Sequence, residues 1–234
     1  MNDIYYSEGF RSYLQKTYLY TAAGIVLSAL TSFISAMLLP RMLMALGQAY
    51  SILMWVAVFA EMGVAMYFSA RLAKMSTSTA WTCYLLYSVL TGFTFSTLFY
   101  AYSLSSIAMA FVYAAVLFIS MAFIAGSTSV DLSRYSAVFS AGLITLIVAS
   151  LLNGLLFHSS ALNMIVCYAG IILFLFIIVH DIQKLHVFYT QGGYYGEDML
   201  NRLTVYGAFT LYLDFVNIFL RILELLGNRD RRRN

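Results

Sequence analysis

Two aspartates lie within the last two long apolar runs of the chain, where a charged side chain is costly. Asp181 follows His180 in the run FLFIIVHDIQKL, and Asp214 lies in the run LYLDFVNIFL. Ionisable groups at membrane depth usually face the interior of a helix bundle and have a partner there. Carboxylates can hold protons, and their oxygens are the ligands that Ca²⁺ prefers. The two acids are therefore candidates for proton or cation binding.

Further charged residues extend this pattern on the last run and on the second. On a helix, one face of the last run would carry Asp214, Asn217, Arg221 and Glu224. A helix with such a polar stripe cannot face lipid there, so we expect it in the middle of a bundle. Glu61 lies deep in the second run, and a lone buried glutamate is expensive. We expect it to form an ion pair with Arg221, in a structural or gating role.

The composition indicates that a bilayer surrounds the helices that must position these residues. Of the 234 residues, 62% are hydrophobic and 10% are charged, with a mean hydropathy of +0.83. Soluble domains carry about 25% charged residues. A helix needs about 20 apolar residues to span a membrane. The sequence has seven such stretches, which leave no room for a soluble domain: about 17–38, 50–74, 78–101, 105–126, 134–157, 163–188 and 203–226.

The length of these runs indicates the fold class. In lipid every backbone polar group must be satisfied internally, so only helices and closed barrels span a membrane. Barrel strands would be about ten residues long and would alternate, whereas these runs are twice as long and do not. We expect Pro40 to lie in a loop. The sequence predicts a single polytopic all-α membrane domain, residues 1–234, with seven transmembrane helices.

The basic residues predict the orientation in the membrane. The side of the N-terminus receives seven of them, and the other side receives only Arg41 before the tail NRDRRRN. The positive-inside rule then places the N-terminus in the cytoplasm. The tail conflicts with this if the seventh run crosses fully. Either a late tail is tolerated outside, or the last run is shorter or re-entrant. We interpret the tail as a topology or lipid-headgroup signal, with no nucleic-acid partner.

Other features indicate packing more than chemistry. Cys83 and Cys167 fall in or near spans and are expected to be packing residues, not a disulfide. No histidine and cysteine cluster has zinc spacing, and the sequence shows no nucleotide-binding glycine loop or serine nucleophile motif. The segment TQGGYYGEDMLNR is expected to be a solvated turn. We expect no cofactor.

The aspartate motifs resemble those of a known family. HDIQKL and LYLDFVNIFL together are similar to motifs of the Bax inhibitor-1 family, the transmembrane Bax inhibitor motif proteins. The stretches TGFTFSTLF, FIAGSTSVDLSRYSA and VASLLNGLLF support this resemblance, and the second of them looks like the bacterial branch. The resemblance covers almost the whole chain. One departure is His180, where the family often has Tyr or Phe.

The resemblance implies six helices wrapped around a central seventh, and a hydrogen-bonded dyad of Asp181 and Asp214. Two carboxylates in contact at low dielectric cannot both ionise cheaply, so they share a proton and can titrate nearer neutrality. An ionised pair would attract a cation. We therefore expect a pH-sensitive calcium leak channel, closed when the dyad is protonated. The resemblance also implies a counter-ion for the closed state, for which Arg71 is the candidate.

Several alternatives stay open at this stage. Each acid could be a buried polar anchor, and Arg71 could be an ordinary snorkelling residue. The same acids could serve a cation/proton exchanger. Some family members act on a membrane protease or on cell-death proteins, and the mixed N-terminal segment would then be the docking feature. We expect no enzyme, because intramembrane aspartyl proteases carry Gly-x-Gly-Asp and Asp214 does not follow such a motif. The expected location is the bacterial cytoplasmic (inner) membrane.

Overall fold

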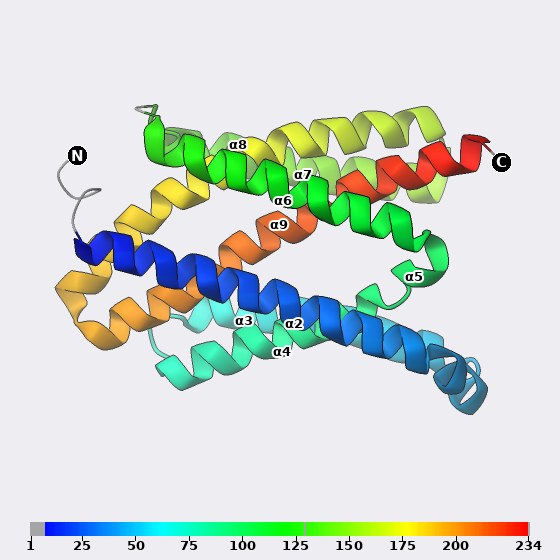
Figure 1. The fold of residues 1–234 in the computed structure, drawn as a ribbon, viewed down its shortest axis with the longest axis horizontal. Helices are drawn as coiled ribbons and strands as arrows, with labels where there is room; N and C mark the ends of the chain where they lie inside the picture. Colours follow the sequence, from blue (N-terminus) through cyan, green and yellow to red (C-terminus); the bar gives the residue numbers. More distant parts are fainter. Residues whose placement is uncertain (1–7, 129, 234) are drawn as a thin grey trace. The chain divides into compact units, whose positions relative to one another are not determined.

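A computed structural model shows that the described chain is helical (Figure 1). The structure describes residues 8–128 and 130–233, with side chains as far as residue 227. These ranges contain no strand, which confirms the all-α prediction. The helical elements are α2 (Glu8–Leu46), α3 (Ala49–Arg71), α4 (Thr77–Phe95), α5 (Leu98–Ala101), α6 (Leu104–Ser127), η1 (Ser133–Tyr135), α7 (Ser136–Leu152), the π-helix η2 (Asn153–Phe157), α8 (Ser160–Tyr195) and α9 (Glu197–Arg233).

Six helical stretches of the described chain are long and apolar enough to cross a membrane. They coincide with the first six apolar runs of the sequence and are, in chain order, Glu8–Leu46, Ala49–Arg71, Thr77–Ala101, Leu104–Ser127, Ser133–Phe157 and Ser160–Tyr195. The seventh predicted run forms most of α9.

The structure corrects the expectation that Pro40 lies in a loop. This proline is inside α2, which continues to Leu46, beyond the predicted end of the first run. A proline removes one backbone hydrogen bond, but the residues on both sides of it are mostly apolar. In lipid every other backbone group still needs a partner, which favours continuing the helix. The helix ends instead before Gly47, whose φ of +53° suits a glycine.

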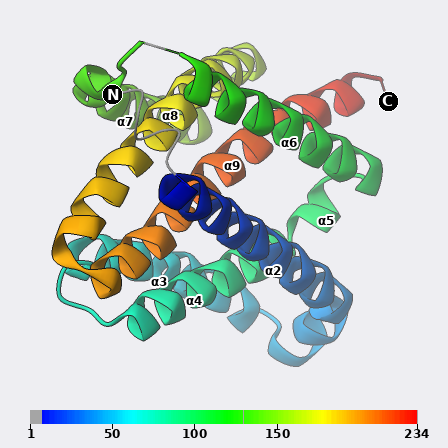
Figure 2. The same cartoon turned by 60° about the vertical axis from the view of Figure 1, so that its left-hand side comes forward.

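The segment TQGGYYGEDMLNR is mostly exposed, as the sequence predicts, but it is helical on both sides of one residue and is not an extended turn. Helix α8 continues to Tyr195 and α9 begins at Glu197, so that only Gly196 separates the two (Figures 1 and 2). Gly196 has a φ of +99°, a conformation that other residues rarely adopt. The two helices therefore form a tight hairpin. Gly196 allows its turn, and Gly192 allows its close approach to Leu200.

The described chain divides into two compact units. The first unit comprises residues 1–101 and 186–212, and the second comprises residues 102–185 and 213–234. Helices α8 and α9 each contribute to both units. Asp181 and Asp214 belong to the second unit. Whether the chain acts as one membrane domain stays a prediction.

In the first unit, small and hydroxyl residues bring α2 and α4 close together. The Ser28 hydroxyl of α2 donates to the backbone carbonyl of Ser88 at 2.8 Å, and it lies 2.6 Å from the Tyr212 hydroxyl of α9. Gly92 of α4 lies directly against α2, because a Cβ atom there would be 2.5 Å from the Ser28 carbonyl oxygen. Small residues at helix contacts are typical of packing in lipid, where hydrophobic burial drives association only weakly.

In the second unit, α6 and α8 contact the C-terminal half of α9. The Phe215 ring of α9 meets Phe111 and Phe118 of α6 at centroid distances of 5.4 and 6.1 Å. Gly170 of α8 makes room for the Arg221 side chain, because a Cβ atom there would lie 3.2 Å from its Nε. The apolar residues of this half of α9 are mostly buried, so it faces its neighbours more than lipid.

We predict that Gly92→Ala destabilises the protein and that Gly63→Ala does not. The new methyl group at residue 92 would clash with the backbone of α2, and overpacking of this kind costs about 1–3 kcal/mol. A Cβ atom at Gly63 has no other heavy atom within 4 Å, so alanine there should be neutral or slightly stabilising. Thermal unfolding of both variants in detergent checks this. Equal melting temperatures for the two variants would contradict the close contact.

Candidate functional site

Asp181 has a histidine as its hydrogen-bond partner. Its Oδ1 lies 2.7 Å from Nδ1 of His180, the residue before it in α8. Only 13% of the Asp181 side chain and 12% of the His180 side chain are exposed. A hydrogen bond of this length between two nearly buried groups fixes the imidazole ring relative to the carboxyl group. The acid and the ring therefore form one unit of the site.

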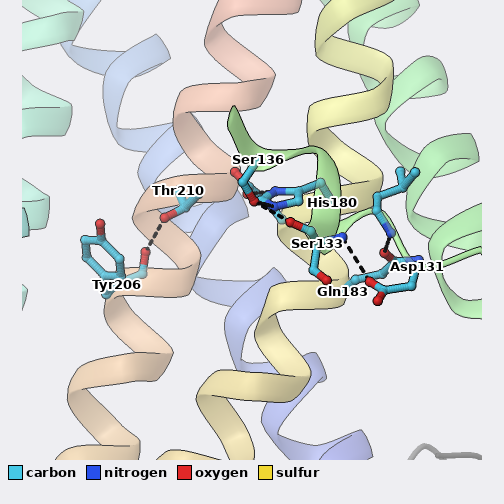
Figure 3. Close-up of polar contacts among 9 residues, drawn as sticks. Asp131, Ser133, Ser136, His180, Gln183, Tyr206 and Thr210 are labelled. Atoms are coloured by element: carbon cyan, nitrogen blue, oxygen red, sulfur yellow. Dashed lines mark hydrogen bonds and ion pairs between the residues drawn. The ribbon is translucent and has the colours of Figure 1, made fainter. Parts of the chain in front are cut away.

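The other ring nitrogen of His180 reaches the start of α7. Its Nε2 lies 2.8 Å from the Ser136 hydroxyl oxygen, and that hydroxyl donates to the Ser133 carbonyl at 2.8 Å (Figure 3). The Phe139 ring packs edge-on against the imidazole, with a centroid distance of 5.4 Å. The histidine is thus held from both sides, and a line of hydrogen bonds runs from Asp181 to the exposed start of α7.

Gln183 ties the connection between α6 and α7 to α8. Its side-chain amide donates to the Val130 carbonyl at 2.8 Å, and its carbonyl oxygen accepts from the Leu132 N–H at 3.0 Å. Paired bonds from one amide fix both the position and the direction of the backbone that they hold. This connection is therefore anchored to α8 at Gln183, two residues after Asp181 in the sequence; Figure 3 shows Gln183 beside the connection.

Asp214 is the more deeply buried of the two acids. Only 4% of this residue is exposed, and among the described residues its Oδ2 has no hydrogen-bond partner. Asp181 is close enough to exert an electrostatic repulsion on it. The structure thus brings the two acids near each other within one unit, although His180 is the hydrogen-bond partner of Asp181. A direct hydrogen bond between the two carboxyl groups stays a prediction.

The members of the predicted ion pair Glu61–Arg221 each have another partner in their own unit. The Thr94 hydroxyl of α4 donates to Glu61 at 2.8 Å. Arg221 lies 3.5 Å from Glu224, one turn along α9. The Glu61–Arg221 pair would join the two units and stays a prediction.

Glu224 has a second contact, with α8. The Cys167 thiol donates to its carboxylate at 3.1 Å. Both Cys167 and Cys83 are free and buried, which confirms that they are packing residues and not a disulfide. Of the predicted polar stripe, Asn217 donates to the Leu213 carbonyl one turn back and is satisfied within its own helix.

Arg71 is the last residue of α3, and it is exposed. Its carbonyl accepts from the N–H groups of Lys74 and Met75, which closes the end of the helix. This agrees with its expected place at the end of the second run, and its role as counter-ion to the aspartates stays a prediction.

Among the described residues, no three His, Cys, Asp or Glu side chains form a group that could hold a metal ion. Calcium at Asp181 and Asp214 would therefore need further oxygen ligands from backbone carbonyls or water.

The sequence reasoning missed the roles of Ser136 and Gln183. Gln183 had a signal, because it is a polar residue inside the motif HDIQKL at the end of an apolar run. Ser136 lies in the family-like stretch FIAGSTSVDLSRYSA, but nothing in that stretch points to His180, which is 44 residues away.

Comparison with known proteins relates nearly the whole chain to one family. The model of the family described as "Inhibitor of apoptosis-promoting Bax1" matches residues 10–231. Inner membrane protein YbhL of Escherichia coli (strain K12) is 33% identical over 221 residues, which cover 94% of this chain and 93% of the relative. The uncharacterized protein RP147 of Rickettsia prowazekii (strain Madrid E) is 34% identical over 224 residues, which cover 96% of this chain and 92% of the relative.

We predict that Gln183→Leu loosens the connection between α6 and α7. The variant loses two hydrogen bonds to the backbone, each worth about 1 kcal/mol. Amide hydrogen exchange at Leu132 should then rise by about tenfold or more. Gln191→Leu is the matched control, because Gln191 is exposed on the same helix. Exchange mass spectrometry of the peptide that contains Leu132 is the measurement, and unchanged exchange would show that Gln183 does not hold this segment.

Proposed function

Because the chain belongs to the Bax inhibitor-1 family of membrane proteins, we propose that it is a pH-sensitive calcium leak channel. Its gate in this proposal is the carboxyl pair of Asp181 on α8 and Asp214 on α9. Protonation of the pair closes the path, and ionisation opens it to a cation.

The observation that carries this proposal is the unpaired oxygen of Asp214 in a buried place. A buried acceptor without a partner costs about 1–3 kcal/mol. Either of two changes would remove this cost at Asp214. A proton shared with the nearby Asp181 would satisfy the oxygen in the closed state, and a cation would satisfy it in the open state.

The repulsion between the two acids supports two states that respond to pH. When the pair has lost its last proton, two negative charges lie close together with little water to screen them. The repulsion can be relieved by a shift of α8 against α9, by an incoming cation, or by both. Calcium suits this site because it prefers carboxylate oxygens and accepts further oxygen ligands in flexible geometry. Arg71, as the counter-ion of the closed state, completes the proposal.

The proposal includes an architecture and a location. In the proposed architecture six helices wrap around α9, which is the seventh and central span. The burial of most apolar side chains of α9 supports this arrangement. The membrane is the cytoplasmic (inner) membrane of a bacterium, and the N-terminus lies in the cytoplasm. Two observations support this: the Escherichia coli relative is named an inner membrane protein, and basic residues favour the N-terminal side.

Two other functions would use the molecule differently. A cation/proton exchanger would use the same two acids but would couple calcium movement to a proton gradient. A regulator of a membrane protease or a cell-death protein would dock through the N-terminal segment, of which residues 1–7 lie outside the described structure. We assign no catalytic step to the aspartates.

The test is calcium flux into proteoliposomes between about pH 5 and 8. We predict a wild-type leak that rises with pH, by up to about tenfold per pH unit for each proton released. The double variant Asp181→Asn with Asp214→Asn keeps the shape of both side chains but cannot ionise, so its flux should no longer depend on pH. Glu197→Gln is the matched control, because it neutralises an exposed acid in the first turn of α9.

Three results would count against the leak. The aspartate gate would be excluded if no calcium flux is detected at any pH. It would also be excluded if the wild type and the double variant leak calcium equally. Calcium movement that follows an imposed proton gradient, and ceases without it, would identify an exchanger instead.

A further inference from the structure

We propose that His180 and Ser136 form a proton route between Asp181 and the exposed connection of α6 and α7. The role of this route in gating rests on the proposed leak, whereas the route itself depends only on the hydrogen bonds around His180. His180 and Ser136 are positioning and relay residues in this account, and Asp181 is the group that gains or loses the proton.

An unbroken line of hydrogen bonds makes the route. The Asp181 carboxyl oxygen lies 2.7 Å from His180 Nδ1. His180 Nε2 lies 2.8 Å from the Ser136 hydroxyl, and Figure 3 shows these two side chains together. Both distances fall in the usual range of hydrogen bonds, so neither step needs a movement of the chain. An imidazole can accept a proton at one nitrogen while it releases one from the other, which suits it to carry protons at physiological pH.

The bond from Ser136 to Ser133 assigns a direction to this line. In the arrangement that we propose, the Ser136 hydroxyl keeps its bond to the Ser133 carbonyl, and its oxygen accepts the Nε2 proton of His180. A neutral imidazole with its proton on Nε2 accepts at Nδ1. The partner at Nδ1 is then the protonated carboxyl group of Asp181, which is the first state of the release step: the proton shared by the two acids has moved to Asp181 Oδ1.

Each proton in the release step has a source and a destination. The Asp181 proton passes to His180 Nδ1, and the proton of Nε2 passes to the Ser136 oxygen. The Ser136 hydroxyl turns from the Ser133 carbonyl toward water and gives its own proton to the water. Asp181 ends as a carboxylate, His180 and Ser136 stay neutral, and one proton has left the site. Uptake of a proton follows the same steps in reverse.

The outer end of the route is exposed and carries an acid. Ser136 is exposed at the start of α7, and Asp131 is exposed in the connection before it. Hydrogen bonds from the side chain and backbone N–H of Ser133, with smaller contributions from the charges of Arg134 and His180, lower the pKa of Asp131. This carboxyl group therefore stays ionised near neutrality, where it attracts protons to the mouth of the route.

Charged groups from each neighbouring element bear on His180. Asp181 lies next to it on α8, and Lys184 follows one turn along the same helix. Asp131 and Arg134 come from the connection between α6 and α7. Asp214, from α9, acts through Asp181.

The same three residue types occur in serine hydrolases, where Asp orients His and His takes the serine proton. Here the Ser136 hydroxyl has the Ser133 carbonyl as a second acceptor, to which it donates in the proposed arrangement. A serine that already gives its proton elsewhere is not activated by the histidine. The arrangement thus favours movement of protons over attack by the serine.

The rate of proton exchange at the buried carboxyl groups tests the route without any calcium. Purified full-length protein in lipid nanodiscs receives a rapid pH jump, and time-resolved infrared spectroscopy follows the protonated carboxyl band. We expect His180→Ala to slow the change of this band after the pH jump by at least about tenfold, which is within the range by which a general acid or base accelerates proton transfer. Added imidazole should restore the rate, because it can replace the missing ring, which a merely structural role would not allow.

A second variant keeps the test independent of how well His180→Ala folds. Ser136→Ala should also slow the change but should leave its final extent unaltered, because it does not touch Asp181. Ser140→Ala, one turn further along α7 and also exposed, is the matched control and should exchange at the wild-type rate. Wild-type rates in both His180→Ala and Ser136→Ala, or a slow His180→Ala that imidazole does not restore, would overturn the route. If proton exchange is slow in His180→Ala and imidazole restores it, but the wild-type protein leaks no calcium, the proton route is supported and the calcium leak is rejected.

Discussion

The cost of holding a carboxyl group in an apolar helix bundle is the constraint on which the rest of the site depends. Asp214 is almost fully buried and has an oxygen with no hydrogen-bond partner among the described residues. An ionised carboxylate in such a place is costly unless a charge or several donors compensate for it. Protonation or cation binding lowers that cost, so a buried acid of this kind converts pH into a change of state.

The two acids meet this constraint in different ways, and the difference gives them separate roles. Asp181 is tied through His180 to Ser136 at the exposed start of α7, so it can exchange protons with water. Asp214 has no such connection in the described structure, and the electrostatic influence on it comes from Asp181. In our account Asp181 therefore exchanges the proton and Asp214 responds. The two hydrogen bonds from Gln183 to the connection between α6 and α7 keep the outer end of the proton route in place.

The sequence predicted the helices well and the contacts within the site poorly, for physical reasons. Apolar length determines where a span lies, so the first six runs match the helices that can cross a membrane. Pro40 was misjudged because lipid favours a continued helix, which overrides residues that end helices in water. The segment TQGGYYGEDMLNR was misjudged in its extent, because α8 and α9 both continue into it and only Gly196 interrupts them. The two aspartates stood out as charges in apolar runs. The bond from His180 to Ser136 joins residues 44 apart, and no periodicity or motif in the sequence indicates it.

The central claim is that Asp181 and Asp214 titrate as a pair that shares a proton, and equilibrium infrared titration of the protein in nanodiscs tests it most directly. Our account predicts a protonated carboxyl band that persists above the range of a free aspartate, near pH 4, and disappears toward neutrality. It also predicts that either single Asn variant removes this behaviour, because each leaves one acid without its partner. Two independent titrations near pH 4, unchanged when the other aspartate is replaced, would contradict the claim.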